Sequence, residues 1–103
     1  MDLTRGLRGI LLILMDFEWD EAKSRSNREK HGVDFSAARA LWDDPDRVEI
    51  PARTEDEPRW LVVGRIGSGV WSAVTATLGE RTRIISVRRA RRKEVKLYES
   101  EGI

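Results

Sequence analysis

The clearest pattern along the chain is a set of three apolar segments in its second half. Residues 59–66, 70–78 and 81–89 are rich in β-branched and aromatic side chains, which are typical of strands. The short links between them contain glycine and have the lengths of hairpin turns. The pattern therefore predicts an antiparallel meander, preceded by a shorter strand at residues 46–51.

Residues 21–31 have the end signals of a helix but lack an apolar stripe. Asp20 is a good N-cap, and Gly32 stands just past the last helical position. Ala22 is the one apolar residue, whereas a surface helix usually needs an apolar face to hold it on a core. The side chains that align on one face at helical spacing are polar: Lys23, Asn27, Lys30 and His31.

Two further helices complete the pattern. Residues 33–45 predict a helix that is capped by Asp34 and stopped by Pro45, and residues 90–100 predict a helix after the last strand. The order indicates an α+β domain, with two N-terminal helices, a meander sheet and one C-terminal helix.

The N-terminal residues 1–14 stand apart from this domain, which we place at residues 15–103. The apolar run from Ile10 to Met15 is too short to span a membrane and lacks the features of an export signal. We interpret residues 1–14 as an extra edge strand or as an extension that arises from an upstream start, with translation beginning at Met1 or Met15.

Composition changes the picture through the distribution of charge. The net charge is only +1, but residues 1–57 carry 9 Lys/Arg against 14 Asp/Glu, and residues 58–103 carry 10 against 4. Between Arg81 and Lys96 there are eight basic residues and one acidic residue, Glu94. A segment of this kind attracts phosphate whatever the total charge.

The lack of cysteine and the single histidine narrow the chemistry. They exclude disulfides, thiolate metal sites and imidazole-rich metal sites. We expect a cytoplasmic protein with no metal, no cofactor and no membrane association.

Each chemical signal has a structural alternative. The arginines form either a solvated helix face or a phosphate site, and nucleic acid suits them better than a nucleotide because no phosphate-binding loop is present. His31 is either a residue favoured at a helix C-terminus or a catalytic group. The tryptophans suit core packing, with Trp71 as a candidate for base stacking.

Two stretches carry a family resemblance. FEWDEAKSRSNREKHGVDFSAARALWDDP and RIISVRRARRKEVKLYE together resemble the BrnT family of bacterial toxins from type II toxin-antitoxin systems. The resemblance covers about residues 16–99 and rests on the paired signatures WDxxKxxxNxxKHG and RIISxRRAxRxE.

The resemblance implies a RelE-like fold and a metal-independent endoribonuclease that cleaves RNA and inhibits translation. It also implies neutralisation by a BrnA-type antitoxin with a ribbon-helix-helix domain. Toxin and antitoxin together would repress their own operon, so that operator DNA is reached through the antitoxin.

Metal-free cleavage uses the 2′-hydroxyl of the RNA as the nucleophile, so the protein must position the strand, stabilise the phosphorane and move protons. We expect Arg88 and Arg89 to stabilise negative charge. The candidate proton-transfer groups are Glu94, Tyr98 and His31. The candidate RNA-binding residues are Lys23, Lys30, Arg65, Arg92 and Lys93. We expect Asn27 to join the first helix to the sheet.

A rival hypothesis needs no chemistry. The chain would then be a non-catalytic module whose basic C-terminal face binds nucleic acid or an acidic segment of a partner.

Overall fold

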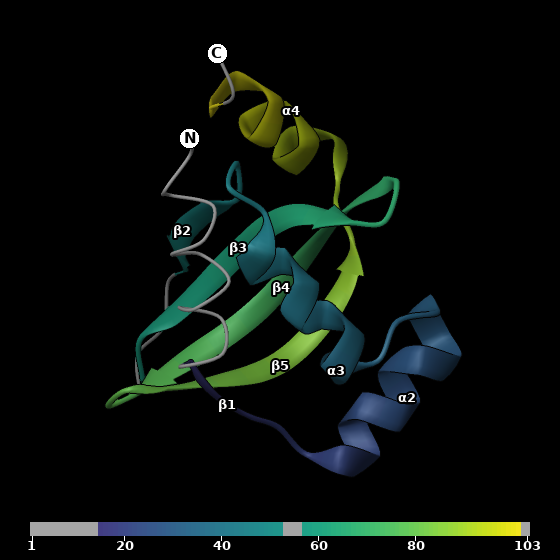
Figure 1. Cartoon of the computed structure of the whole chain (residues 1–103), viewed down its shortest axis with the longest axis vertical. Coiled ribbons are helices and arrows are strands. Elements are labelled where there is room, and N and C mark those ends of the chain that lie inside the picture. The colour runs from purple at the N-terminus through teal and green to yellow at the C-terminus, as the bar shows by residue number, and fades with distance from the viewer. Residues whose placement is uncertain (1–14, 53–56, 102–103) are drawn as a thin grey trace, which may run out of the picture.

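The computed structural model of the chain describes residues 15–52 and 57–101. Strands within these residues form one five-stranded sheet in the order β1-β5-β4-β3-β2 (Figure 1). Helices accompany it, so the predicted α+β class is confirmed. The strands are β1 (Asp16–Glu18), β2 (Val48–Ala52), β3 (Arg59–Ile66), β4 (Gly69–Leu78) and β5 (Arg81–Arg89).

The sheet is mixed, which corrects the prediction of a purely antiparallel meander. Strands β2 to β5 pair antiparallel in chain order as predicted, but β1 pairs parallel to β5, with Asp16 opposite Arg81. Turn residues between two strands predict only the pairing of strands that are adjacent in sequence, whereas two parallel strands are joined by a long connection. Here the partners are about sixty residues apart in the chain, so local patterns did not reveal their pairing.

The helix ends follow the predicted caps. Asp20 accepts a hydrogen bond from the backbone N–H of Lys23 at 3.0 Å and caps α2 (Glu21–His31). Gly32 ends this helix at a φ of 86°, a left-handed conformation that glycine adopts without steric cost.

The second predicted helix is divided. Asp34 caps α3 (Phe35–Ala38) as expected, but the chain then tightens into the 3-10 helix η1 (Arg39–Asp43) before Pro45. A 3-10 turn is a common way for an α-helix to end. The last helix, α4 (Arg92–Glu101), begins two residues later than predicted.

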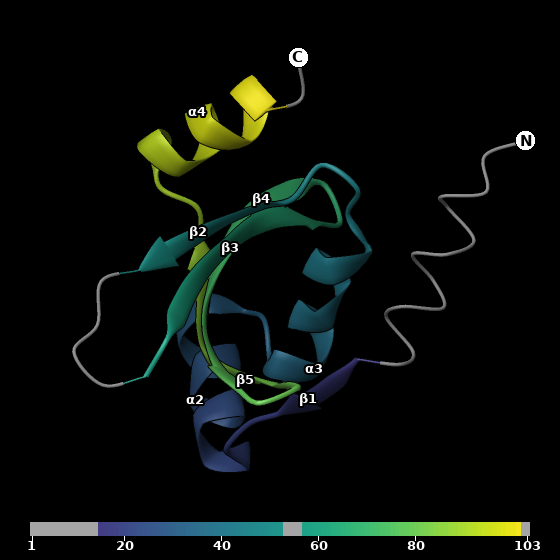
Figure 2. The same cartoon turned by 90° about the vertical axis from the view of Figure 1, so that its left-hand side faces the viewer.

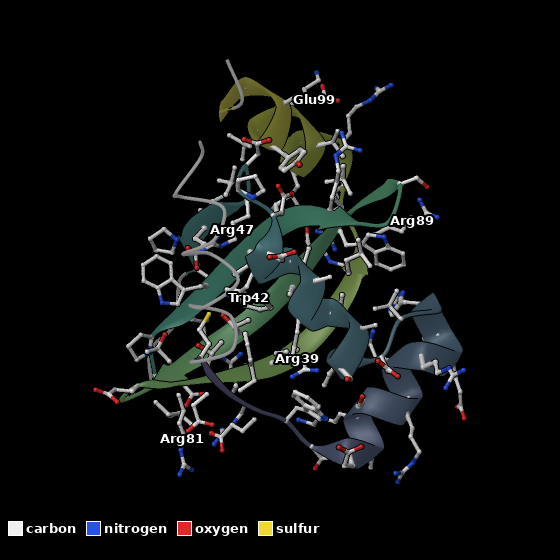
Figure 3. All side chains as sticks on the ribbon, viewed as in Figure 1. Arg39, Trp42, Arg47, Arg81, Arg89 and Glu99 are labelled. Atoms are coloured by element: carbon white, nitrogen blue, oxygen red, sulfur yellow. The ribbon has the colours of Figure 1, made fainter. Side chains whose placement is uncertain are left out.

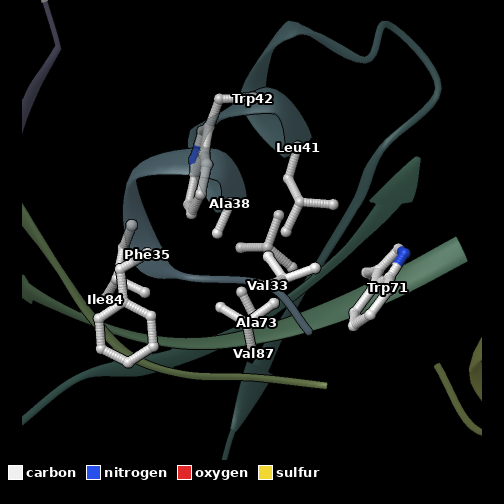
Figure 4. Close-up of a cluster of buried hydrophobic side chains, with 10 residues drawn as sticks. Val33, Phe35, Ala38, Leu41, Trp42, Trp71, Ala73, Ile84 and Val87 are labelled. Carbon is white, nitrogen blue, oxygen red and sulfur yellow. The ribbon is translucent and has the colours of Figure 1, made fainter. Parts of the chain in front are cut away.

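The hydrophobic core lies between one face of the sheet and the α3–η1 segment (Figure 4). Side chains of alternate strand residues, such as Ala73 and Val87, meet Phe35 and Leu41 there and are almost fully buried. Trp71 belongs to this core, so the structure does not leave it open for base stacking. Helix α4 lies on the other side of the curved sheet (Figure 2).

Helix α2 is held by polar anchors in place of an apolar stripe. The buried amide of Asn27 donates from Nδ2 to the carbonyl of Val33 at 2.7 Å and accepts at Oδ1 from the backbone N–H of Val87 at 3.1 Å. Buried Ser24 accepts from the N–H of Phe35 through Oγ at 2.9 Å. The prediction that Asn27 joins this helix to the sheet is confirmed.

Candidate functional site

Arg88 and Glu94 form a bidentate ion pair where β5 passes into α4. Nη1 and Nη2 of Arg88 lie 2.7 and 2.9 Å from Oε1 and Oε2 of Glu94. Oε1 also accepts from the Ser72 hydroxyl and from the backbone N–H of Arg91, each at 2.8 Å. We call Ser72, Arg88, Arg91 and Glu94 the junction cluster.

The fold fixes every member of the junction cluster. Ser72 and Arg88 are cross-strand neighbours in β4 and β5, so their side chains share a face of the sheet. Glu94 stands in the first turn of α4 and closes back on the N–H of Arg91, as in a capping box. The carboxylate therefore ties two strands and a helix to a single point.

The pair sets the charge state of both partners. Hydrogen bonds from Arg88 lower the pKa of Glu94 to about 2, against the opposing effect of burial. The same hydrogen bonds raise the pKa of Arg88. Glu94 is thus a carboxylate at neutral pH, and its proton-accepting oxygens are already occupied by hydrogen-bond donors.

Arg89 points to the opposite face of the sheet. Its guanidinium carbon lies 5.2 Å from the centre of the Trp71 ring, a cation-π distance, and the residue is exposed (Figure 3). Trp71 is 7% exposed and provides a rigid support. Arg89 is therefore oriented by an aromatic ring, which leaves its N–H donors available.

Two further predicted cations stand in the first turn of α4. Arg92 and Lys93 are both exposed there, next to the exposed side chain of Arg91. Glu94 is the acidic residue of this turn, and Arg88 already holds it. The end of the sheet thus carries positive charge in excess of its carboxylates.

Tyr98 belongs to a separate contact on α4. Its hydroxyl donates to Oδ2 of Asp44 at 2.7 Å, and the Arg65 guanidinium lies 5.8 Å from its ring centre. Tyr98 is 6% exposed. Burial, and then the bond to Asp44, raises the pKa of Tyr98, so the phenol keeps its proton at neutral pH.

The polar face of α2 lines a cavity against β5, which we call the α2 pocket. Its volume is about 220 Å³, and its lining brings together three of the predicted residues, Lys23, Lys30 and His31. The remaining lining residues are Ser26, Asn27, Phe35, Ile85 and Ser86.

The direction of α2 places His31 toward the junction. Lys23 shares a surface hollow with Arg83 near the start of β5, whereas Asn27 binds the N–H of Val87 near its end. The helix therefore advances in the same sense as β5, and its last residue, His31, lies on the side where β5 ends (Figure 1).

A family model described as "Ribonuclease toxin, BrnT, of type II toxin-antitoxin system" matches residues 19–94. The matched region contains the α2 pocket and the whole junction cluster. The chain belongs to this family. No curated protein matches it. Membership of the BrnT family, whose members are ribonuclease toxins of type II systems, implies an RNA substrate and an antitoxin partner.

Some of the predicted BrnT site residues meet and others do not. Arg88 bonds Glu94 directly, Lys23, Lys30 and His31 share a pocket, and Arg65 lies over Tyr98. Tyr98 lies outside the residues matched by the BrnT model and does not join the junction cluster.

Sequence reasoning missed Ser72 and Asp44, which bind Glu94 and Tyr98. The register of the predicted β4–β5 hairpin could have revealed Ser72, because it is the hydroxyl that faces Arg88 across the strands. Asp44 gave no comparable signal, because both groups that its carboxylate binds, the N–H of Arg65 and the hydroxyl of Tyr98, are far away in the chain.

Within residues 15–52 and 57–101 of the BrnT fold, no group of three or more His, Cys, Asp or Glu side chains is placed to hold a metal ion. The helices of that part of the chain are also too short or too polar to cross a membrane.

Proposed function

We propose that this BrnT protein is an endoribonuclease that cleaves RNA without a metal ion and thereby inhibits translation. The observation that carries the proposal is the junction cluster: a buried carboxylate fixes one arginine at the end of β5 while other cations around it are exposed. In such a reaction the 2′-hydroxyl of the substrate gives up its proton and attacks the adjacent phosphate. The bond from phosphorus to the 5′-oxygen of the next nucleotide breaks, that oxygen takes up a proton, and a 2′,3′-cyclic phosphate remains. The protein then has to supply positioning, charge stabilisation and proton transfer.

Arg89 and Arg88 divide the electrostatic role. Arg89 is exposed, oriented by Trp71 and free of a carboxylate partner among the described contacts, so it contacts the phosphorane. Arg88, on the other face of the sheet, uses its N–H groups on Glu94 and on the carbonyl of Arg89, and its charge adds to the positive field at the end of β5. Its position is fixed in advance, which avoids reorganisation during the reaction.

His31 is the candidate proton-transfer group that the geometry favours. It is exposed at the end of α2 nearest the end of β5, and one ring nitrogen of a neutral imidazole can accept a proton while the other donates one. Glu94 and Tyr98 act as positioning residues instead: Glu94 holds Arg88, and Tyr98 holds α4 to Asp44.

RNA reaches this centre along a basic path. The residues that track its backbone are Lys23, Lys30, Arg65, Arg92 and Lys93. Their side chains are exposed on α2, β3 and α4. Lysine and arginine bind phosphates without regard to sequence, which suits a strand-guiding role.

The partner proposals follow from the resemblance. The antitoxin is of the BrnA type, has a ribbon-helix-helix domain, and brings the toxin to operator DNA for joint repression of the operon. The fold is RelE-like, and the protein acts in the cytoplasm. The surplus of positive charge around α4 suits an acidic antitoxin segment.

The test is primer extension on RNA treated with purified protein, with and without ribosomes, in the presence of EDTA. We expect discrete cleavage that survives EDTA, is reduced more than 100-fold in Arg89→Ala and His31→Ala, and changes less than tenfold in Tyr98→Phe. Loss of cleavage with the chelator would refute the metal-independent mechanism. Binding without any cleavage would favour the rival binding module.

A further inference from the structure

The α2 pocket is built differently from the rest of the surface. Its wall on the α2 side is Lys23, Ser26, Asn27, Lys30 and His31, and its floor includes Ile85 and Ser86 of β5. A helix with this composition has little apolar area to bury. Its polar face instead lines a hollow that already contains apolar floor, hydroxyl groups and two ammonium groups.

The floor of the pocket is shaped by a β-bulge. Val74 pairs with Ser86 and Thr75 pairs with Ile84, so Ile85 has no cross-strand partner. An extra residue bends its strand and turns its side chain out of the regular alternation. Ile85 is half-buried in consequence, and it is a lining residue of the α2 pocket.

The walls of the pocket are held rigidly. Asn27 spans from α2 to β5 through its bonds to Val33 and Val87, and Ser24 ties the helix to the start of α3. The spacing between α2 and the bulge is therefore set by buried hydrogen bonds, which cost free energy to break. A site with fixed walls can bind without first being ordered.

The pocket lies close to the junction cluster along β5. Ser86 lies two residues before Arg88 on β5, and residues at this spacing share a face and lie about 7 Å apart along a strand. A ligand in the α2 pocket therefore lies near Arg88, at the end of β5 where Arg89 follows.

We propose that the α2 pocket binds one nucleotide of single-stranded RNA, adjacent to the phosphate that is cleaved. Its base contacts Ile85, and the flanking phosphates pair with Lys23 and Lys30. This inference rests on the proposed function, because it identifies the substrate's neighbouring nucleotide at the same site. The pocket thus supplies register and base preference, while the junction supplies charge stabilisation.

Size and chemistry favour this ligand. The pocket volume of about 220 Å³ has room for one base but not for a larger ligand, since sites for drug-sized ligands commonly measure roughly 300 to 1,000 Å³. Two lysines separated by two turns of helix suit a chain of phosphates, while Ser26, Asn27 and Ser86 provide hydrogen-bonding groups for a base edge.

The first test measures binding of a 2′-O-methyl oligonucleotide, which lacks the attacking hydroxyl and remains intact. We expect the double variant Lys23→Ala/Lys30→Ala to bind at least tenfold more weakly. The slope of log K against log salt should fall by about 1.4, because each phosphate contact on a single strand contributes about 0.7.

The matched control is Arg25→Ala/Arg28→Ala. It removes the same charge from exposed positions of α2 that do not line the pocket. We expect affinity within threefold of the unmodified protein and an unchanged salt slope. Equal losses in the two double variants would overturn the proposal, because binding would then follow the total charge of the helix.

The second test replaces single bases of the oligonucleotide by abasic sites. One position should lose about tenfold in affinity with the unmodified protein and show no such loss with Ile85→Ala. An abasic profile that Ile85→Ala leaves unaltered would overturn the base contact.

Cleavage assays on the same variants separate the two proposals. Absence of cleavage with the pocket-dependent binding intact would refute the ribonuclease assignment alone. Cleavage with unaltered binding in Lys23→Ala/Lys30→Ala would refute the pocket assignment alone.

Discussion

The two ends of β5 use arginine in opposite ways. At its start, Arg81 and Arg83 face the carboxylates of β1: Arg81 Nε lies 3.2 Å from Asp16 Oδ2, and Arg83 Nε lies 3.6 Å from Glu18 Oε1. At its end, Arg88 has the buried carboxylate of Glu94, and Arg89 has the ring of Trp71. Figure 3 labels Arg81 and Arg89 at these two ends.

The difference lies in exposure and in the ratio of charges. The side chains of Arg81 and Asp16 are 62% and 61% exposed, whereas those of Arg88 and Glu94 are 25% and 12% exposed. Exposed ion pairs contribute little to stability. At the start of β5, the pairs therefore mainly balance the charges of β1 and β5 where these two strands lie side by side. The second end fixes one arginine firmly and leaves positive charge over for a ligand.

The largest expected effect separates the two ends by activity. Arg89→Ala should lower kcat for RNA cleavage by roughly 10² to 10³, the usual cost of removing a group that stabilises developing negative charge. Arg81→Ala removes the same charge from the other end of β5 and should stay within threefold of the unmodified protein. Equal losses would show that the arginines of β5 act only through total charge.

The next effect separates the ends by stability. Glu94→Gln leaves Arg88 without its carboxylate and weakens the link between β4, β5 and α4, so the free energy of unfolding should fall by about 2 kcal/mol. Glu18→Gln removes a partly exposed partner of the exposed Arg81 and Arg83 and should cost less than about 0.5 kcal/mol. Urea denaturation of both variants measures the contrast, and similar midpoints would contradict it.

Acid should weaken the contribution that Glu94 makes to stability. The pKa of Glu94 is about 2 in the folded protein and near 4.5 when unperturbed, so its contribution to stability is present above about pH 4.5 and is lost as pH falls toward 2. The gap in unfolding free energy between the unmodified protein and Glu94→Gln should therefore narrow by about 1 to 2 kcal/mol over this range, with allowance for the partly exposed Arg88. Urea denaturation at pH 6, 4 and 3 measures it, and a constant gap would refute the assigned pKa.

Sequence patterns sufficed for the parts of this fold that depend on neighbours in the chain. The caps Asp20 and Asp34 act as predicted, and the bounds of β3 and β5 agree with residues 59–66 and 81–89. The parallel pairing of β1 depended on a partner about sixty residues away. In hindsight, Asp16 and Glu18 opposite Arg81 and Arg83 form a complementary pattern, but nothing local selects that register.

The candidate site divides in the same manner. The polar face of α2 could be recognised from helical spacing alone, and the pocket contains Lys23, Lys30 and His31 as that spacing suggests. The roles of Glu94 and Tyr98 could not be recognised in this way, because each depends on tertiary contacts. Glu94 binds Ser72 and Arg88, and Tyr98 binds Asp44. A carboxylate's function follows from what surrounds it, and the sequence shows only that it is present.

The smallest expected effect comes from a variant in which the start of β5, like its end, carries unpaired positive charge. Asp16→Asn/Glu18→Gln leaves Arg81 and Arg83 without their carboxylates, so that end should also carry surplus positive charge. RNA affinity should rise two- to threefold at low salt and return to the original value near 0.3 M salt, because exposed charges are screened there. The kcat for cleavage should not change, since the unpaired Arg81 and Arg83 lie at the far end of the strand from Arg89. A rise in kcat would mean that the start of β5 belongs to the reaction centre and that the division between the two ends is wrong.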